Sequence, residues 1–554
     1  MKKMNLKHFG VMLDMSRNSV MTVPSLKNYM RLMKKMGYDT LLLYMEDTYE
    51  VTDEPQLGYM RGGYTQADLR EIDDYAAELG MPLIPCIQTL GHMTAYKRWG
   101  AAPYDKDDIL LVGDERTYEL IDHMLSSLAK TLRTRLIHIG MDEAYGLGQG
   151  TYLEKNGYES KDSIIKKHLA RVREIGQKYG FTMMVWSDMF FSSWAGGAYG
   201  NIPKTKIPKE YLDAMPKDII PVYFWYYGDN VEQYSDMMYN HRQFTDDYWY
   251  AGGPWTYTGI MPHNDFTISS MTAAMTAARK NKVKNIIMTL WGNDGGECSR
   301  YAALPSLFYV AELMKGNTDE AKIKARFERM FKVSFDDFML LDSLDHACGN
   351  GPSAYVVANP ARYAVFQDAF NGYLDVTIER DAAHRFLPLA EKLAAVAKKT
   401  RTYAPIFRTA AKLASLLAIK YDLGVRTRDA YDRGDKAELL RLAKEDYPEA
   451  IRCTDALLRA FEAQWMWENR PEGFDVQQIR FSGVKARLDY CRRTLLAYLS
   501  GKLSTIRELD TRLLPVEDIK NASMFFEGEP NPGESPNVLF ADYTMTTSIT
   551  LAKQ

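Results

Sequence analysis

The sequence predicts an α/β protein, a (β/α)8 TIM barrel followed by a mostly α-helical C-terminal domain. From residue 8 to about residue 315, eight short apolar runs alternate with amphipathic segments, and long helical stripes follow. The chain has 554 residues, more than the ~250–300 at which a single core stops growing, so a second domain is expected. We expect the barrel over residues 1–315, a helical domain over 316–526, and a linker with a C-terminal tail over 527–554.

The eight apolar runs have the length and the Val, Ile, Leu and aromatic content of buried parallel strands. They are FGVMLD (9–14), TLLLYM (40–45), LIPCIQ (83–88), LIHIGM (136–141), MMVWSD (183–188), IIPVYFW (219–225), YWYAGG (248–253) and IIMTLW (286–291). Segments with helical spacing separate most of them; in residues 25–37, for example, Leu26, Tyr29 and Met33 share one face and Gly37 ends the helix. An open doubly wound sheet is the alternative. The count of eight and the lack of GxGxxG after the first run favour a closed barrel.

After residue 316 the pattern changes to helices. In FLPLAEKLAAVAKK, Leu389, Leu393 and Val396 fall at positions i, i+4 and i+7. The segment QWMWENRPEGFD (464–475) has two interpretations. It is either a loop that docks on the barrel mouth or on a partner subunit, or an ordinary helix end with buried Trp. The composition of EGEPNPGESPN (527–537) indicates a linker, and the residues after it suggest a closing strand or hairpin.

Composition excludes several classes of protein. A net charge of −3 without a basic stripe argues against a nucleic-acid partner. The N-terminal residues lack the pattern of a signal peptide, and no run of ~18 apolar residues exists to span a membrane, so we expect a soluble, cytoplasmic protein. Five scattered cysteines without a CxxC pair argue against a disulfide framework and a structural zinc site; they are Cys86, Cys298, Cys348, Cys453 and Cys491.

Polar and aromatic residues crowd the carboxyl ends of the predicted strands, where barrel enzymes carry their chemistry. Packing alone explains such crowding poorly. The residues are Asp14, Glu46, Asp47, Gln88, His92, Asp142, Glu143, Asp188, Trp225, Tyr227, Trp255, Trp291, Asp294 and Glu297.

The most informative stretch is LIHIGMDEAYGLG, in which a strand ends directly before Asp142 and Glu143. Two carboxylates in a semi-buried mouth do not both titrate normally, because repulsion and desolvation raise the pKa of one of them. That protonated partner can act as a general acid. The simpler interpretation is a helix cap or a solvated pair, and the position after the fourth strand favours the catalytic one.

The segment from His138 to Glu143 resembles the signature of glycoside hydrolase family 20, the β-N-acetylhexosaminidases. Further matches occur in the family's order across the whole barrel, and the chain looks closest to a bacterial subgroup in which a helical domain follows the barrel. These matches are Gly10–Arg17, Gly91-His92, Trp186, Trp225, Pro254-Trp255 and Trp291-Gly292.

The resemblance implies an exo-β-N-acetylhexosaminidase that releases terminal GlcNAc or GalNAc from glycans or glycoconjugates by substrate-assisted retaining hydrolysis, without cofactor or metal. It implies Glu143 as acid and base, and Asp142 as the carboxylate that supports the substrate's acetamido group. Either Tyr227 or Tyr257 would hold the acetamido oxygen, and a homodimer is left open. The remaining predicted substrate-binding residues are Arg17, Glu46, His92, Trp186, Asp188, Trp225, Trp255, Trp291, Asp294 and Glu297.

The sequence also departs from the family pattern. Phe9 stands where many members carry an arginine that grips the sugar's outer hydroxyls, so Arg17 or Glu46 is the candidate for that task. The α/β domain that often precedes the barrel is not found before the first strand. Two other functions compete with the proposed one: a metal-dependent barrel hydrolase, disfavoured because no HxH or HExxH occurs among nine His, and a non-catalytic glycan-binding barrel, disfavoured because both carboxylates are present.

Overall fold

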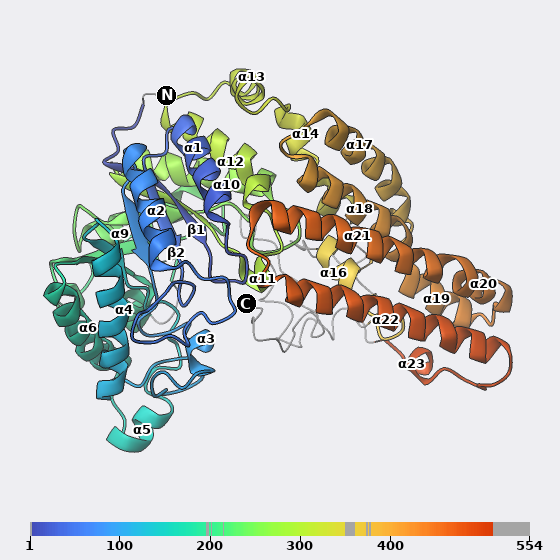
Figure 1. Ribbon diagram of the computed structural model, residues 1–554, viewed down its shortest axis with the longest axis horizontal. Coiled ribbons are helices and arrows are strands. Elements are labelled where there is room, and N and C mark those ends of the chain that lie inside the picture. Colours follow the sequence, from blue (N-terminus) through green and yellow to red (C-terminus); the bar gives the residue numbers. More distant parts are fainter. Residues whose placement is uncertain are drawn as a thin grey trace. The chain divides into compact units, whose positions relative to one another are not determined.

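Eight parallel strands, hydrogen-bonded in chain order from β1 to β8, close into a barrel in the computed structural model (Figure 1). The predicted (β/α)8 barrel is therefore confirmed. The strands are β1 (His8–Asp14), β2 (Thr40–Tyr44), β3 (Leu83–Cys86), β4 (Leu136–His138), β5 (Thr182–Trp186), β6 (Ile219–Phe224), β7 (Trp249–Gly252) and β8 (Asn285–Leu290).

The structure describes residues 3–195, 199–200, 202–213, 215–348, 360–372, 375 and 378–513. The predicted linker and closing strand, beyond residue 526, lie outside these residues.

Helices connect the strands, as the amphipathic segments predict. The first, α1, begins at Val23, where the Thr22 side chain accepts a hydrogen bond from the Ser25 backbone, and it ends at Gly37 in the left-handed conformation that glycine favours. The α-helices between the strands and directly after β8 are α1 (Val23–Met36), α2 (Gln66–Glu78), α3 (Thr94–Lys97), α4 (Glu115–Thr131), α5 (Thr151–Asn156), α6 (Lys161–Lys178), α7 (Asp188–Ala195), α8 (Lys209–Leu212), α9 (Val231–Arg242), α10 (Asn264–Lys280), α11 (Asn293–Gly296) and α12 (Leu304–Met314).

Alternation along the strands fills the barrel interior. On β1 the side chain of Met12 joins the core inside the barrel, and Asp14, two residues on, shares its face at the carboxyl end. Phe9 has the opposite parity and stacks on Tyr38, with ring centroids 4.2 Å apart. The core contains Met12, Leu42, Tyr44, Ile84, Cys86, Met184, Trp186, Val222, Trp249, Ala251 and Ile287.

The chain divides into two compact units. The first, the barrel unit, comprises residues 1–254, 266–292 and 306–318; the second, the helical unit, comprises 255–265, 293–305 and the chain from 319 on. The segments that follow β7 and β8 thus belong to the helical unit, although a single boundary near residue 315 was expected.

Long antiparallel helices build the helical unit, and α17, α18, α21 and α22 pack in succession (Figure 1). The Trp465 indole donates to the Arg470 carbonyl oxygen at 2.7 Å, which closes the turn between α21 and α22. Its helices are α13 (Glu320–Phe331), α14 (Phe335–Met339), α15 (Ser343–Cys348), α16 (Pro360–Phe366), α17 (Phe386–Lys399), α18 (Ala404–Lys420), α19 (Leu423–Asp432), α20 (Lys436–Arg441), α21 (Tyr447–Glu468), α22 (Phe474–Leu499) and α23 (Arg507–Asp510).

None of the helices described here combines the length and the hydropathy needed to cross a bilayer. All five cysteines are buried free thiols.

Candidate active site

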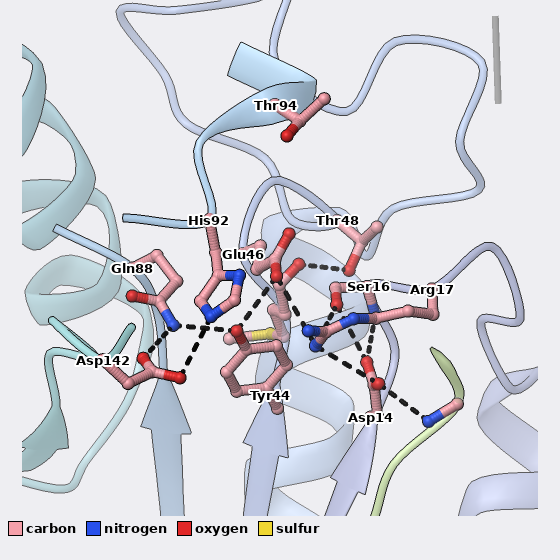
Figure 2. A network of polar contacts seen from close by, with 12 residues as sticks. Asp14, Ser16, Arg17, Tyr44, Glu46, Thr48, Gln88, His92, Thr94 and Asp142 are labelled. Atoms are coloured by element: carbon pink, nitrogen blue, oxygen red, sulfur yellow. Dashed lines mark hydrogen bonds and ion pairs between the residues drawn. The ribbon is translucent and has the colours of Figure 1, made fainter. Parts of the chain in front are cut away.

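Side chains from the carboxyl ends of the first four strands meet in one polar network (Figure 2). Gln88, just beyond β3, connects them: its Nε2 donates to Asp142 Oδ1 at 2.7 Å and to the Tyr44 hydroxyl at 2.9 Å. Its Oε1 accepts the backbone N–H of Met141 at 3.1 Å. One amide side chain therefore fixes both the Asp142 carboxylate and the backbone before it.

The backbone turns sharply between β4 and Asp142. Gly140, Met141 and Glu143 have φ of 72°, 75° and 54°, the left-handed region that non-glycine residues rarely enter. A Cβ on Gly140 would lie 2.1 Å from Gln88 Oε1, so only glycine fits there. Such conformations cost about 1–3 kcal/mol each and persist where surrounding contacts enforce them. The turn directs the Asp142 and Glu143 side chains into different surroundings.

Asp142 is buried and carries a charge partner. His92 Nε2 lies 3.1 Å from Asp142 Oδ2. Burial alone would raise the pKa of Asp142, but the charge of His92 and the hydrogen bonds from His92 and Gln88 outweigh it and lower that pKa. Burial opposes the charge on His92, yet Asp142 raises the pKa of His92 to about 9. At neutral pH the two form an ion pair, with Asp142 ionised.

Glu143 is much more accessible, with 47% of its side chain exposed. Its Oε2 lies 3.6 Å from His92 Nε2, and its backbone N–H donates to Asp188 Oδ2 at 2.8 Å. Asp188, the first residue of α7, is fully buried; burial and the charges of Asp142 and Glu143 raise its pKa well above the usual range. Asp188 thus holds the backbone that carries Glu143.

A second cluster surrounds Arg17 beside this network (Figure 2). Its Nη1 lies 3.4 Å from Asp14 Oδ2 and 3.5 Å from Glu46 Oε1. The guanidinium carbon lies 5.0 Å from the ring centroid of Tyr44 and 5.2 Å from that of Trp291. The Tyr44 hydroxyl, which accepts from Gln88, donates to Glu46 at 2.9 Å. The predicted residues Arg17 and Glu46 are therefore connected to Asp142 through Tyr44 and Gln88.

Aromatic rings stand at the same strand ends. Trp186 lies 6.0 Å from Trp291 between ring centroids, and the Tyr44 ring meets the Trp291 ring edge-on at 4.8 Å. Trp225 and Tyr227 form another pair at 5.0 Å. Within the part of the chain that the structure describes, the indole N–H groups of Trp186 and Trp225 find no hydrogen-bond acceptor.

Four predicted site residues belong to the helical unit: Trp255, Tyr257, Asp294 and Glu297. Trp255 is buried and packs against Tyr257, at 5.3 Å between ring centroids. Glu297 is buried, with Arg362 Nε at 2.6 Å and Arg480 Nη1 at 2.6 Å. Burial would raise the pKa of Glu297, but these two arginines lower it. Both carboxylate oxygens of Glu297 are engaged in ion pairs, while the side chain of Asp294 lies outside the described residues.

Sequence reasoning missed Tyr44 and Arg61. Tyr44 belongs to an apolar run, and its hydroxyl contacts are apparent only in the fold; strand parity, which places Tyr44 on the Leu42 face, was the available signal.

Arg61 lies in the loop between β2 and α2. It donates to Asn18 Oδ1 at 3.1 Å and to the Ser16 carbonyl oxygen, and its Nε lies 2.8 Å from Asp47 Oδ2. It connects the loops that carry Arg17 and Glu46.

We expect Arg61→Ala to lower the free energy of unfolding by about 3–5 kcal/mol, because the Asp47 carboxylate would remain buried without its ion-pair partner. Chemical denaturation measures this loss. Lys7→Ala is the matched control: its ion pair with Asp247 lies at the surface, where such pairs contribute about 0–1 kcal/mol. Equal losses in the two variants would contradict the structural role of Arg61.

Among the described residues, no three His, Cys, Asp or Glu side chains are grouped so that they could hold a metal ion. Two unlike carboxylates, a charged histidine and aromatic rings thus lie at the mouth of the barrel, an arrangement typical of barrel enzymes that act on glycosides.

The comparisons with known proteins define the family. The family model "Glycosyl hydrolase family 20, catalytic domain" matches residues 6–211, and "Glycoside Hydrolase 20C C-terminal domain" matches residues 336–525. The chain therefore belongs to glycoside hydrolase family 20, as its resemblance to that family predicts.

Individual relatives are distant. Human hexosaminidase D is 23% identical over 369 residues, which are 59% of this chain and 69% of the relative. A β-hexosaminidase of Vibrio furnissii is 31% identical over 121 residues, 19% of each chain. Among solved structures, a family 20 exo-β-N-acetylglucosaminidase of Vibrio harveyi is similar at 17% identity and a TM-score of 0.45, over 61% of this chain and 58% of that one. The chain thus spans between about a fifth and two thirds of these relatives' lengths.

Proposed function

We propose that the protein is an exo-acting β-N-acetylhexosaminidase that releases terminal β-linked GlcNAc or GalNAc from glycans or glycoconjugates. The observation that carries this proposal is the unlike setting of two adjacent carboxylates. Asp142 is buried and held by Gln88 and His92, whereas Glu143 is half exposed. Membership in the family supports the same activity.

In the proposed mechanism the substrate supplies its own nucleophile. The acetamido carbonyl oxygen attacks the anomeric carbon, the glycosidic bond breaks, and an oxazolinium ion forms. Water attacks the anomeric carbon of this ion in the second step, so the product retains the β configuration. Asp142, ionised because His92 and Gln88 lower its pKa, accepts the acetamido N–H and stabilises the positive charge that develops there. Tyr227 would hold the acetamido oxygen in its attacking position, with Tyr257 as the alternative.

Glu143 performs the proton transfers. Its exposed carboxyl group can reach both a departing glycosidic oxygen and the water that replaces it. In the first step it donates a proton to the leaving oxygen; in the second it removes one from the water that attacks the anomeric carbon. Asp188 serves this step indirectly, by fixing the Glu143 backbone.

The remaining pocket would bind the terminal sugar. Arg17 and Glu46 are the proposed partners of its outer hydroxyls, in place of the arginine that Phe9 replaces. Trp186, Trp225 and Trp291 would enclose the acetamido methyl and the sugar ring. The binding of the sugar's O4 and O6 by Asp294 and Glu297, and a substrate contact of Trp255, stay predictions. For Glu297 this binding would require a carboxylate whose two oxygens already pair with arginines.

A panel of aryl β-glycosides tests this function. We expect hydrolysis of the N-acetylglucosaminide or N-acetylgalactosaminide, and at least ~10³-fold slower hydrolysis of the plain glucoside, because the neighbouring amide provides the proximity that an external nucleophile lacks. Proton NMR of the first product should show the β-anomer. Comparable turnover of the plain glucoside, or initial release of the α-anomer, would contradict substrate assistance.

A further inference from the structure

A buried serine separates two residues of the candidate site. Ser187 lies between Trp186, the last residue of β5, and Asp188, the first residue of α7. A serine directly before a helix commonly turns its hydroxyl back to cap the first backbone N–H groups of that helix. Ser187 Oγ instead lies 2.7 Å from His241 Nε2 and 3.0 Å from the Val222 carbonyl oxygen. Its hydroxyl therefore joins the end of β5 to β6 and α9.

His241, on α9, is held as a hydrogen-bond acceptor. Its Nδ1 lies 2.7 Å from the Met237 carbonyl oxygen, which only accepts, so Nδ1 carries the proton. Burial lowers the pKa of His241 to about 3, so at neutral pH the ring is uncharged and Nε2 accepts the Ser187 hydroxyl. The ring also stacks on Phe191, with 4.3 Å between the centroids. Both its tautomer and its orientation are therefore fixed.

Asp188 connects this anchor to the candidate proton donor. Its Oδ2 accepts the Glu143 backbone N–H at 2.8 Å, and Glu143 stands in the left-handed region, with a φ of 54°. Such a backbone keeps its conformation only where the surrounding contacts enforce it. Because Ser187 precedes Asp188 directly, one covalent link and one hydrogen bond transmit a displacement of Ser187 to the backbone of Glu143.

We propose that His241 is a positioning residue for the Glu143 carboxyl group and acts on it through Ser187 and Asp188. This inference rests on the proposed function, in which Glu143 donates and accepts the proton. A general acid must come within about 2.6–3.2 Å of the glycosidic oxygen. A misplacement of about 1 Å, caused by a mutation away from the chemistry, can lower the rate about 10²-fold.

Two variants remove the contact from either side, and a third is their control. Ser187→Ala deletes only the hydroxyl, and His241→Phe keeps a ring of similar shape without the acceptor. Asn240→Ala is the matched control, because Asn240 is the neighbouring residue of α9, is equally buried, and donates to the carbonyl oxygens of Ile202 and Pro203. It thus fixes α9 to a different segment of the chain. Chemical denaturation gives the stability of all three.

Two substrates separate a positioning role from a merely structural one. The leaving group of a β-linked N-acetylglucosamine disaccharide must be protonated, whereas that of a nitrophenyl N-acetylglucosaminide departs as an anion. For Ser187→Ala and His241→Phe we expect kcat/KM to fall about 10-fold on the disaccharide and to stay within about 2-fold on the aryl glycoside. Asn240→Ala should leave the ratio of the two values unchanged. Equal losses on both substrates, or no loss on the disaccharide with Ser187→Ala, would overturn the proposal.

Two further measurements identify the residue through which His241 acts. In a Glu143→Gln background, Ser187→Ala should cause no further loss on the disaccharide, because the group that it positions is already gone. Hydrogen exchange of the Glu143 backbone N–H should be about 10-fold faster in Ser187→Ala and unchanged in Asn240→Ala. If the wild-type protein hydrolysed neither substrate, the proposed function would fail, and the faster exchange would still support the link to Glu143. Unchanged exchange would refute that link even in an active enzyme.

Discussion

Glu143→Gln should lower kcat on a β-linked disaccharide by about 10²–10⁴-fold, the contribution of a positioned general acid and base. The amide is isosteric with the carboxyl group but neither donates nor accepts the proton that the two steps require. Because Glu143 is half exposed and its backbone N–H binds Asp188, the substitution should leave folding and the affinity for the disaccharide nearly unchanged. Steady-state kinetics and calorimetry measure the two effects.

The loss should depend on the leaving group. A nitrophenolate departs without protonation, so an aryl glycoside should be less impaired in its first step than a disaccharide. Glu154→Gln, an exposed position in α5, is the control for the chemical change itself. Turnover of the disaccharide by Glu143→Gln at the wild-type rate would remove Glu143 from the mechanism.

Asp142→Asn is expected to lower kcat by about 10²–10³-fold, because a neutral amide cannot stabilise the charge that develops on the acetamido group. The amide oxygen can still accept from Gln88, so the geometry of the turn should persist. Activity on an N-acetylglucosaminide measures the loss. The same substitution on Asp114, the partly buried N-cap residue of α4, should leave kcat unchanged.

The same variant should change the titration of His92. Asp142 raises the pKa of His92 to about 9, so its removal lets burial lower that pKa below 6.5. In the wild type, the contribution of His92 to stability is complete below about pH 6.5 and is lost as the pH rises through 9, because its folded pKa exceeds the unfolded one. Asp142, whose pKa is lowered, stays ionised over this range. NMR of the His92 ring and unfolding between pH 6 and 10 follow both effects. An unchanged His92 titration would show that Asp142 is not its partner.

Local patterns were sufficient to predict the barrel and to place Asp142 and Glu143 after its fourth strand; their catalytic roles stay predictions. Each strand of the barrel is a short apolar run, and alternation from Met12 to Asp14 already places a carboxylate at the mouth. The roles assigned to Asp142 and Glu143 came from their position after the fourth run and from the family resemblance. Neither argument depends on contacts between distant parts of the chain.

What could not be predicted depends on such contacts. Gln88 binds Tyr44 and Asp142, 44 and 54 residues away in sequence, and the pairing of β3 with β2 and β4 makes them neighbours. The left-handed backbone of Met141 and Glu143 has no sequence signal, because only Gly140 before them marks a turn. The family resemblance implied that Glu297 binds the substrate, whereas its arginine partners, which lie 65 and 183 residues further on, are apparent only in the fold.

The interleaving of the two units bears on how this enzyme can be dissected. A chain cut near residue 318 would keep the segments 255–265 and 293–305 but lose Asp342, Arg362, Glu468 and Arg480, which bind Asn264, Glu297 and Arg300. Removing one partner of a buried ion pair lowers the free energy of unfolding by about 3–5 kcal/mol. This is a large part of the roughly 5–15 kcal/mol by which a typical protein is stable. A cut between residues 318 and 480 therefore leaves buried polar side chains of segments 255–265 and 293–305 without their partners, so the chain cannot be divided into its two units at a single point.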